Sequence, residues 1–162
     1  MEEWIYDLKI LPNYYIFICN QLLIPYKKNM QYLENINKID TLFLTDIYEP
    51  RKNSLLLEVK GSVVADEETE VYVILFKNYI AYHVLNENFS VPDPNDEFIK
   101  IGHNRLRLFT KSGYMEYILK ETLANDMFPN EMKHYGLYTE HHVIHIIAFK
   151  DPIIEMKVPN RY

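Results

Sequence analysis

The sequence is poor in cysteine, and this shortage limits both its covalent structure and its chemistry. Cys19 is the only cysteine among 162 residues, so the chain cannot form an internal disulfide. It lies in the apolar run YYIFICNQLLI, which is typical of a small buried hydrophobe and lacks the electropositive surroundings of a reactive thiolate. A single buried thiol fits the cytoplasm, where we expect the protein to act.

Arginine is also scarce, and the chain as a whole is acidic. The net charge is −6, and the nearest approach to a basic cluster is Lys27-Lys28. Nucleic-acid binders usually gather lysine and arginine on one face to meet the phosphates. We therefore expect no nucleic-acid partner.

Long hydrophobic runs are missing as well. The longest apolar stretch, residues 14–25, is interrupted by Cys19-Asn20-Gln21 and ends at Pro25. A spanning helix needs roughly 20 apolar residues. The first residues, MEEWIYDLKI, do not form the basic and apolar regions of a signal peptide. We expect a soluble protein with no membrane partner.

Several short motifs with known chemistry are absent. The sequence contains no G-x-G-x-x-G, no G-x-x-x-x-G-K-[ST] and no G-x-S-x-G. The first two cradle nucleotide phosphates, and the third exposes a nucleophilic serine. We therefore expect no cofactor and favour a protein that is not an enzyme.

Apolar residues that alternate with polar ones make up most of the chain, which predicts β-strands. The composition includes 14 Tyr and only 4 Gly, and tyrosine favours strands. The predicted strands are residues 4–10, 14–19, 41–48, 54–64, 71–76, 79–85, 105–110, 133–139 and 142–149, with a short final strand after Pro152. Asn78 favours a tight hairpin between residues 71–76 and 79–85, because asparagine tolerates positive φ.

Helical spacing is confined to two segments. Residues 111–125 place Tyr114 and Ile118 on one face, and Ser112 is the predicted N-cap. Residues 26–39 predict either a short helix or a long loop. Together these elements predict one α+β domain over residues 1–162, with an antiparallel or mixed sheet of about six to eight strands and one or two helices packed on one face. A largely all-β, barrel-like sheet with one helix is the alternative.

The stretch TEHHVIHIIAFKDP, residues 139–152, holds three histidines within five residues. On a helix, His141 and His145 would match the ligands of H-E-x-x-H, but His142 replaces the glutamate that acts as general base. The β-branched residues between them favour a strand instead. On a straight strand His141 and His145 share a face about 13 Å apart, which is too far for one metal ion.

A metal site at His141, His142 and His145 therefore needs a further ligand from the fold, with His83, His103 and His134 as the candidates. The interpretation that we favour makes His145 a core histidine with a hydrogen-bond partner and leaves His141 and His142 in solvent near a turn. The metal site stays open as the alternative.

Acidic residues concentrate in the segment ADEETE. Asp66, Glu67, Glu68 and Glu70 are typical of a solvent-facing turn between strands. They are also the candidate contact for a basic protein partner. A second group, Asp93, Asp96 and Glu97, lies in a loop with two prolines but lacks the order of an EF-hand, so we expect a solvated loop.

The segments RLRLFTKSGYMEYILKETLAN and KHYGLYTEHHVIHIIAFKDPIIE resemble the C-terminal half of small uncharacterised proteins of Firmicute bacteria. The resemblance covers roughly residues 105–155. It implies a bacterial source, and some such proteins resemble immunity proteins that neutralise a toxin. It assigns no functional residues.

These observations predict a cytoplasmic, non-enzymatic bacterial protein that binds another protein. An immunity-like protein is its most concrete form. One alternative is a small metal-dependent enzyme that uses the C-terminal histidine cluster. The other is a self-associating structural protein, because tyrosine-rich edge strands can pair into homodimers.

Overall fold

A computed structural model describes residues 31, 33–62, 70–129 and 132–157. Nearly all of these belong to one compact unit, Tyr32–Tyr162. The strands predicted at 4–10 and 14–19, and Cys19 with them, lie outside the described residues.

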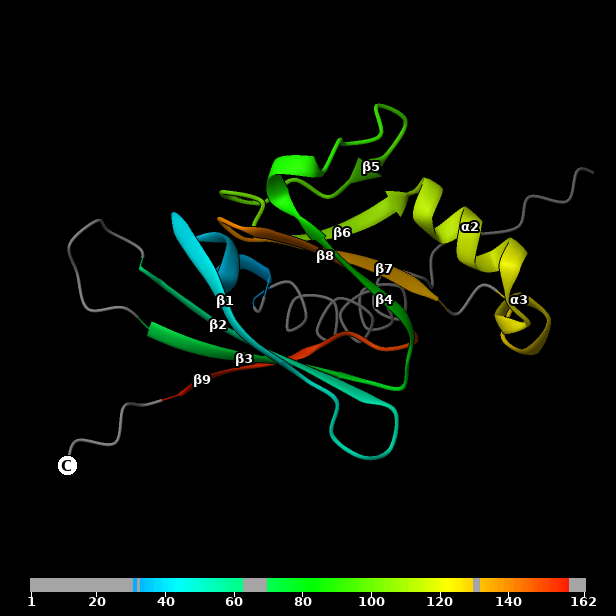
Figure 1. The fold of residues 1–162 in the computed structure, drawn as a ribbon, viewed down its shortest axis with the longest axis horizontal. Coiled ribbons are helices and arrows are strands. Elements are labelled where there is room, and N and C mark those ends of the chain that lie inside the picture. Colours follow the sequence, from blue (N-terminus) through cyan, green and yellow to red (C-terminus); the bar gives the residue numbers. More distant parts are fainter. Residues whose placement is uncertain (1–30, 32, 63–69, 130–131, 158–162) are drawn as a thin grey trace, which may run out of the picture. The chain divides into compact units, whose positions relative to one another are not determined.

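Nine strands form two antiparallel sheets in the described part of the chain (Figure 1). The strands are β1 (Thr41–Tyr48), β2 (Ser54–Ser62), β3 (Glu70–Lys77), β4 (Tyr79–Asn86), β5 (Glu97–Phe98), β6 (Leu106–Lys111), β7 (Lys133–Tyr138), β8 (His142–Ala148) and β9 (Ile153–Lys157). The first sheet has the order β1-β2-β3-β9, and the second has the order β4-β8-β7-β6-β5. The α+β prediction is confirmed.

The helical segments are short. Residues 33–37 are helical, and Leu33, Ile36 and Ile39 are buried, so the helical alternative is confirmed for residues 33–37, while residues 26–30 lie outside the described residues. The others are η1 (Glu87–Phe89), α2 (Gly113–Glu121) and α3 (Ala124–Met127). Ser112 is the N-cap of α2 as predicted, because its hydroxyl accepts a hydrogen bond from the Met115 amide at 3.0 Å. Within the described ranges, no helix is long and apolar enough to cross a membrane.

The hairpin predicted at Lys77-Asn78 is wrong. Asn78 does have positive φ, 57°, and the chain does turn there. However, β3 pairs with β2 and β9, whereas β4 pairs with β8. The turn is a corner at which the chain passes from one sheet to the other. Local sequence predicts a reversal, but it does not decide which strand completes the ladder.

The main core lies where the two sheets meet. Leu55, Leu57, Ile74 and Phe76 from the first sheet are fully buried, as are Leu137, Ile144 and Ile146 from the second. Across the interface the rings of Phe76 and Tyr135 lie 5.3 Å apart. Because side chains alternate along a strand, the second sheet turns its other face away from this core. That outer face holds the polar side chains of the candidate site.

Candidate ligand pocket on the five-stranded sheet

The three predicted histidines of residues 141–145 do not come together. His141 is exposed in the turn before β8, with its ring 5.8 Å from that of Phe43. His142 begins β8, and His145 lies half-buried in its middle. Within the described ranges there is no group of three or more histidine, cysteine or acidic residues that could hold a metal ion.

His145 instead belongs to a row of residues that crosses four strands. It lies opposite His83 of β4 on one side and opposite Gly136 of β7 on the other. Gly136 in turn lies opposite Arg107 of β6. Directly opposed residues in a sheet share a face, so His83, His145 and Arg107 project from the same surface. The row is a product of strand register, since its members are far apart in the sequence.

A cavity of about 190 Å³ lies over this row. The segment between β4 and β6 forms one wall, and Tyr114 at the start of α2 contributes to another. The ring of Tyr114 is 5.5 Å from His83 and 5.6 Å from His145. A cavity with apolar walls and a few convergent polar groups is the usual form of a ligand site. We therefore take this cavity, which we name the row pocket, as the candidate functional site.

His145 is joined to His134 by a hydrogen bond of 2.9 Å between His145 Nδ1 and His134 Nε2. The predicted hydrogen-bond partner is thus present, but His145 is half-buried on the outer face of the sheet and does not lie in the core. Burial lowers the pKa of His134 to about 3 and that of His145 to about 4. Both imidazoles are therefore neutral at pH 7, because a buried cation would lose its hydration.

The hydrogen bond between the two histidines restricts which nitrogen carries the proton. His134 Nδ1 is buried and has no partner. If His145 donated to His134, that buried nitrogen would have to be an unpaired N–H group. If His134 donates, the same nitrogen is only an unpaired acceptor, and unpaired buried N–H groups are the rarer of the two. We assign His134 Nε2 as the donor, so that His145 carries its proton on Nε2.

Arg107 supplies the positive charge of the row pocket. Its guanidinium carbon lies 3.5 Å from the ring centre of Tyr138 and 4.5 Å from that of Phe98. Its Nε donates to the carbonyl oxygen of Asn104 at 3.1 Å. No carboxylate in the described part of the chain forms a salt bridge with Arg107. Burial lowers its pKa, but an arginine stays charged.

Two aspartates border the row pocket, and both have structural partners. Asp96 accepts a hydrogen bond from the Gly113 amide at the start of α2, at 2.9 Å. Asp93 accepts one from the Asn95 amide at 2.8 Å. Acidic groups are favourable at a helix N-terminus. The loop is largely exposed, as predicted, and it also anchors α2 and forms part of a wall of the row pocket.

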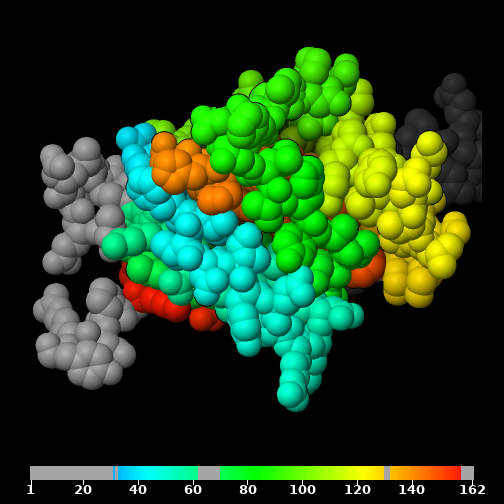
Figure 2. All heavy atoms as spheres, in the orientation of Figure 1, coloured from blue at the N-terminus to red at the C-terminus, as the bar shows by residue number. Residues whose placement is uncertain are grey.

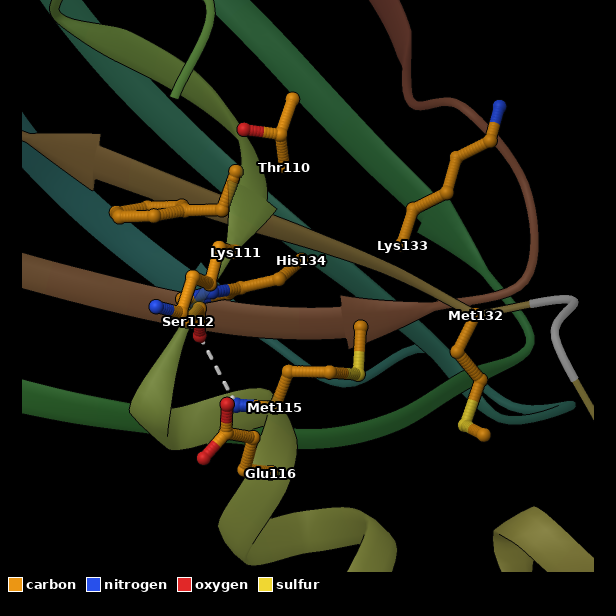
Figure 3. A pocket seen from close by; sticks show the side chains of 9 residues that line it. Thr110, Lys111, Ser112, Met115, Glu116, Met132, Lys133 and His134 are labelled. Carbon is orange, nitrogen blue, oxygen red and sulfur yellow. Dashed lines mark hydrogen bonds between the residues drawn. The ribbon is translucent and has the colours of Figure 1, made fainter. Parts of the chain in front are cut away.

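A second cavity, of about 320 Å³, lies between β6, β7 and α2. Figure 3 shows its lining, with the hydrogen bond that the Met115 amide donates to the Ser112 hydroxyl beside Glu116 and His134. Because His134 lines this cavity while its partner His145 lines the row pocket, the histidine pair lies between the two. The larger cavity has fewer convergent polar groups, and we do not treat it as the site.

The acidic residues proposed as a partner contact are described only at one end. Asp66, Glu67 and Glu68 lie outside the described residues. Glu70 begins β3, and its carboxylate accepts a hydrogen bond from the Tyr72 hydroxyl. The acidic contact for a basic protein stays a prediction.

Comparison with known proteins gives no match. The chain matches no protein-family model, no curated protein and no solved structure. The resemblance over residues 105–155 therefore stays a prediction, and the function must be argued from the pocket.

Sequence reasoning named His83 and His134 as histidines that the fold could bring to His145, and both are brought there. It did not identify Arg107, Tyr114 or Tyr138. A usable signal existed for Arg107, because RLRLFT places a charged residue inside a strand between two leucines. Two arginines at alternate positions, Arg105 and Arg107, mark a polar strand face, although strand register alone decides what that face meets.

Gly136 keeps the centre of the row open. A Cβ atom there would lie 2.7 Å from Cε2 of Phe109 and 2.9 Å from Cε2 of Tyr138. We expect Gly136→Ala to lower the free energy of unfolding by about 1–3 kcal/mol, as overpacked sites do, and to displace the ring that stacks on Arg107. Urea unfolding measures the first effect, and the ring chemical shifts of Tyr138 measure the second. Gly113→Ala, at an exposed helix start, is the control and should change stability by less than about 1 kcal/mol.

Proposed function

We propose that this chain is a non-enzymatic protein-binding module, with an immunity-like protein that neutralises its partner as the most concrete form. One observation carries the proposal. Phe89 and Val91 are 83% and 89% exposed, and they lie in the segment whose Ser90, Val91 and Pro92 line the row pocket. Figure 2 shows the segment after β4, in green, at the surface of this unit.

The exposed side chains of Phe89 and Val91, beside a polar cavity, match the composition of a protein interface. Interfaces combine exposed aromatic and aliphatic anchors with a few charged groups that become desolvated on binding. Phe89 and Val91 are the two most exposed large apolar side chains in the described part of the chain, and they lie two residues apart beside the cavity. The charge of −6 favours a basic partner through long-range attraction.

The two competing functions have weaker support. A metal-dependent enzyme built on His141, His142 and His145 would need ligands that converge, and among the described residues these three belong to no group that could hold a metal ion. Self-association has sheet edges available, since β1 and β9 border the first sheet among the described strands. A test of the proposal must therefore be able to detect a homodimer.

The experiment places a photo-crosslinking phenylalanine analogue at position 89 in the full-length protein, inside the cells that produce it. We expect one discrete crosslinked partner, because Phe89 would lie in the interface. The same analogue at Tyr48, an exposed position on β1 (59% exposed), is the matched control and should give little product.

Val91→Asp should abolish the crosslink from position 89 while leaving the circular dichroism spectrum unchanged, because Val91 is almost fully exposed. Equal crosslinking from positions 48 and 89 would contradict the proposal. A product of twice the monomer mass would favour the self-associating alternative.

A further inference from the structure

We infer that the row pocket binds a carboxylate group, held by the edge of the Arg107 guanidinium and by the Nε2–H of His145. The inference rests on the proposed function in one respect, namely that the carboxylate belongs to a partner polypeptide. The site itself is argued from Arg107, His145 and their surroundings, and it can be tested with small molecules.

Arg107 is held so that only one part of it can meet a ligand. Tyr138 and Phe98 lie against the guanidinium at 3.5 Å and 4.5 Å from their ring centres, and Nε is used by the carbonyl of Asn104. The two terminal nitrogens form a planar edge, and the Tyr138 hydroxyl is a hydrogen-bond partner beside it. That edge matches the two oxygens of a carboxylate in a bidentate pair. The packing around the arginine also restricts its side-chain rotamers before the ligand arrives, which lowers the entropy cost of binding.

His145 adds a second donor. Its Nδ1 is engaged by His134, so Nε2 is the nitrogen left for a ligand in the row pocket that His145 lines. With His134 as the donor in their mutual bond, Nε2 carries a proton. A neutral imidazole N–H can donate to a carboxylate oxygen without adding a buried positive charge. The row pocket therefore offers a carboxylate one cation and one neutral donor, on the part of the lining formed by Arg107 and His145, while Asp93 and Asp96 line the same pocket.

The surroundings argue against phosphate. Asp93 and Asp96 both line the row pocket, and their charges would repel a dianion more strongly than a monoanion. Leu85, Val91 and Pro92 line the same cavity and give an apolar group attached to the carboxylate a surface to contact.

The first experiment titrates the full-length protein with benzoate and, separately, with benzamide, which has the same shape but no charge. Binding is followed by the imidazole nitrogen resonances of His145, which also report its tautomer. We expect benzoate to shift the Nε2 signal and benzamide to bind at least about tenfold more weakly, since benzamide cannot form a charge-assisted hydrogen bond to Arg107 through a carboxylate. Inorganic phosphate should neither shift this signal nor displace benzoate.

Three variants locate the binding. Arg107→Gln should weaken benzoate about tenfold to hundredfold. Arg107→Lys keeps the charge and tests the planar edge, and it should also weaken benzoate. Arg51→Gln removes an arginine from an exposed turn and should leave binding unchanged. If Arg107→Gln does not fold, the lysine variant and the phosphate arm still decide the question.

Equal binding of benzoate and benzamide would overturn the inference, because the cavity would then be merely apolar. Tighter binding of phosphate, or a folded lysine variant with unchanged affinity, would also overturn it. N-Acetylphenylalanine and the amide of N-acetylglutamate then separate a chain terminus from an acidic side chain as the source of the carboxylate. Benzoate binding does not depend on the crosslink from position 89, so failure of the inference and failure of the proposed function are distinguishable.

Discussion

Replacing Asn37 with alanine is expected to lower the free energy of unfolding by about 2–4 kcal/mol. The side chain is 1% exposed. Its Nδ2 donates to the carbonyl of Leu106 at 2.8 Å, and its Oδ1 accepts from the amide of Leu106 at 2.7 Å. Leu106 begins β6, the strand that carries Arg107. The side-chain amide of Asn37 therefore satisfies both main-chain groups of the first residue of that strand. Alanine would leave both main-chain groups of Leu106 buried without partners.

Urea unfolding at pH 7.5 measures this loss, and thermal unfolding should show a fall of about 5–15 °C in Tm. Asn35→Ala is the control, because Asn35 is exposed two residues earlier in the same helical segment. It should cost less than about 1 kcal/mol. Equal losses in the two variants would show that the alanine acts through the helix and not through the bonds to Leu106.

Lowering the pH from 7 to 5 is expected to destabilise the protein by about 2–4 kcal/mol through His134 and His145. Their pKa values are about 3 and about 4 in the folded protein, against 6.5 for an unperturbed histidine. Below pH 6.5 the unfolded chain therefore binds more protons than the folded one. The free energy of unfolding then decreases as the pH is lowered. Each histidine contributes up to about 1.4 kcal/mol per pH unit in this window. The combined loss of stability stays below the sum of the two full histidine contributions, because His145 is partly exposed to solvent.

The measurement is urea unfolding at pH 7 and pH 5 for the wild type and two variants. The double variant His134→Phe/His145→Leu removes both titrating groups and keeps apolar volume in their place, so it should lose much less stability between these two pH values. His141→Gln removes an exposed histidine and should keep the full wild-type loss. If the double variant showed the wild-type pH dependence, carboxylates elsewhere would have to be its cause.

The positions of the elements were largely predictable from the sequence because their causes are local. The strand predicted at residues 41–48 is β1, and alternation also located β7 and β8. Ser112 caps α2 because a short hydroxyl side chain can reach the amide of Met115 three residues on. The hairpin at Asn78 failed because a positive φ turns the chain equally well within a sheet or between two sheets.

The candidate site was predictable only in part. A hydrogen-bond partner was predicted for His145, because apolar residues on both sides of it predict a central strand, but its place on the outer face of the sheet was not predicted. Its partner depends on how β7 lies against β8, and β7 begins 12 residues after α2 ends. Arg107, Tyr114 and Tyr138 belong to three different elements, and no spacing in the sequence relates them.

The sequence by itself determined that the described part of this chain is strand-rich, where most of its strands lie and where α2 begins, since periodicity and capping act over a few residues. It also determined that the usual nucleotide-binding loops and an internal disulfide are absent. Only the tertiary structure decided that β4 pairs with β8 and that His83, His145 and Arg107 form one row. Register is set by the burial of whole strand faces, so it depends on residues that are distant in the chain, and the pocket that follows from it does too.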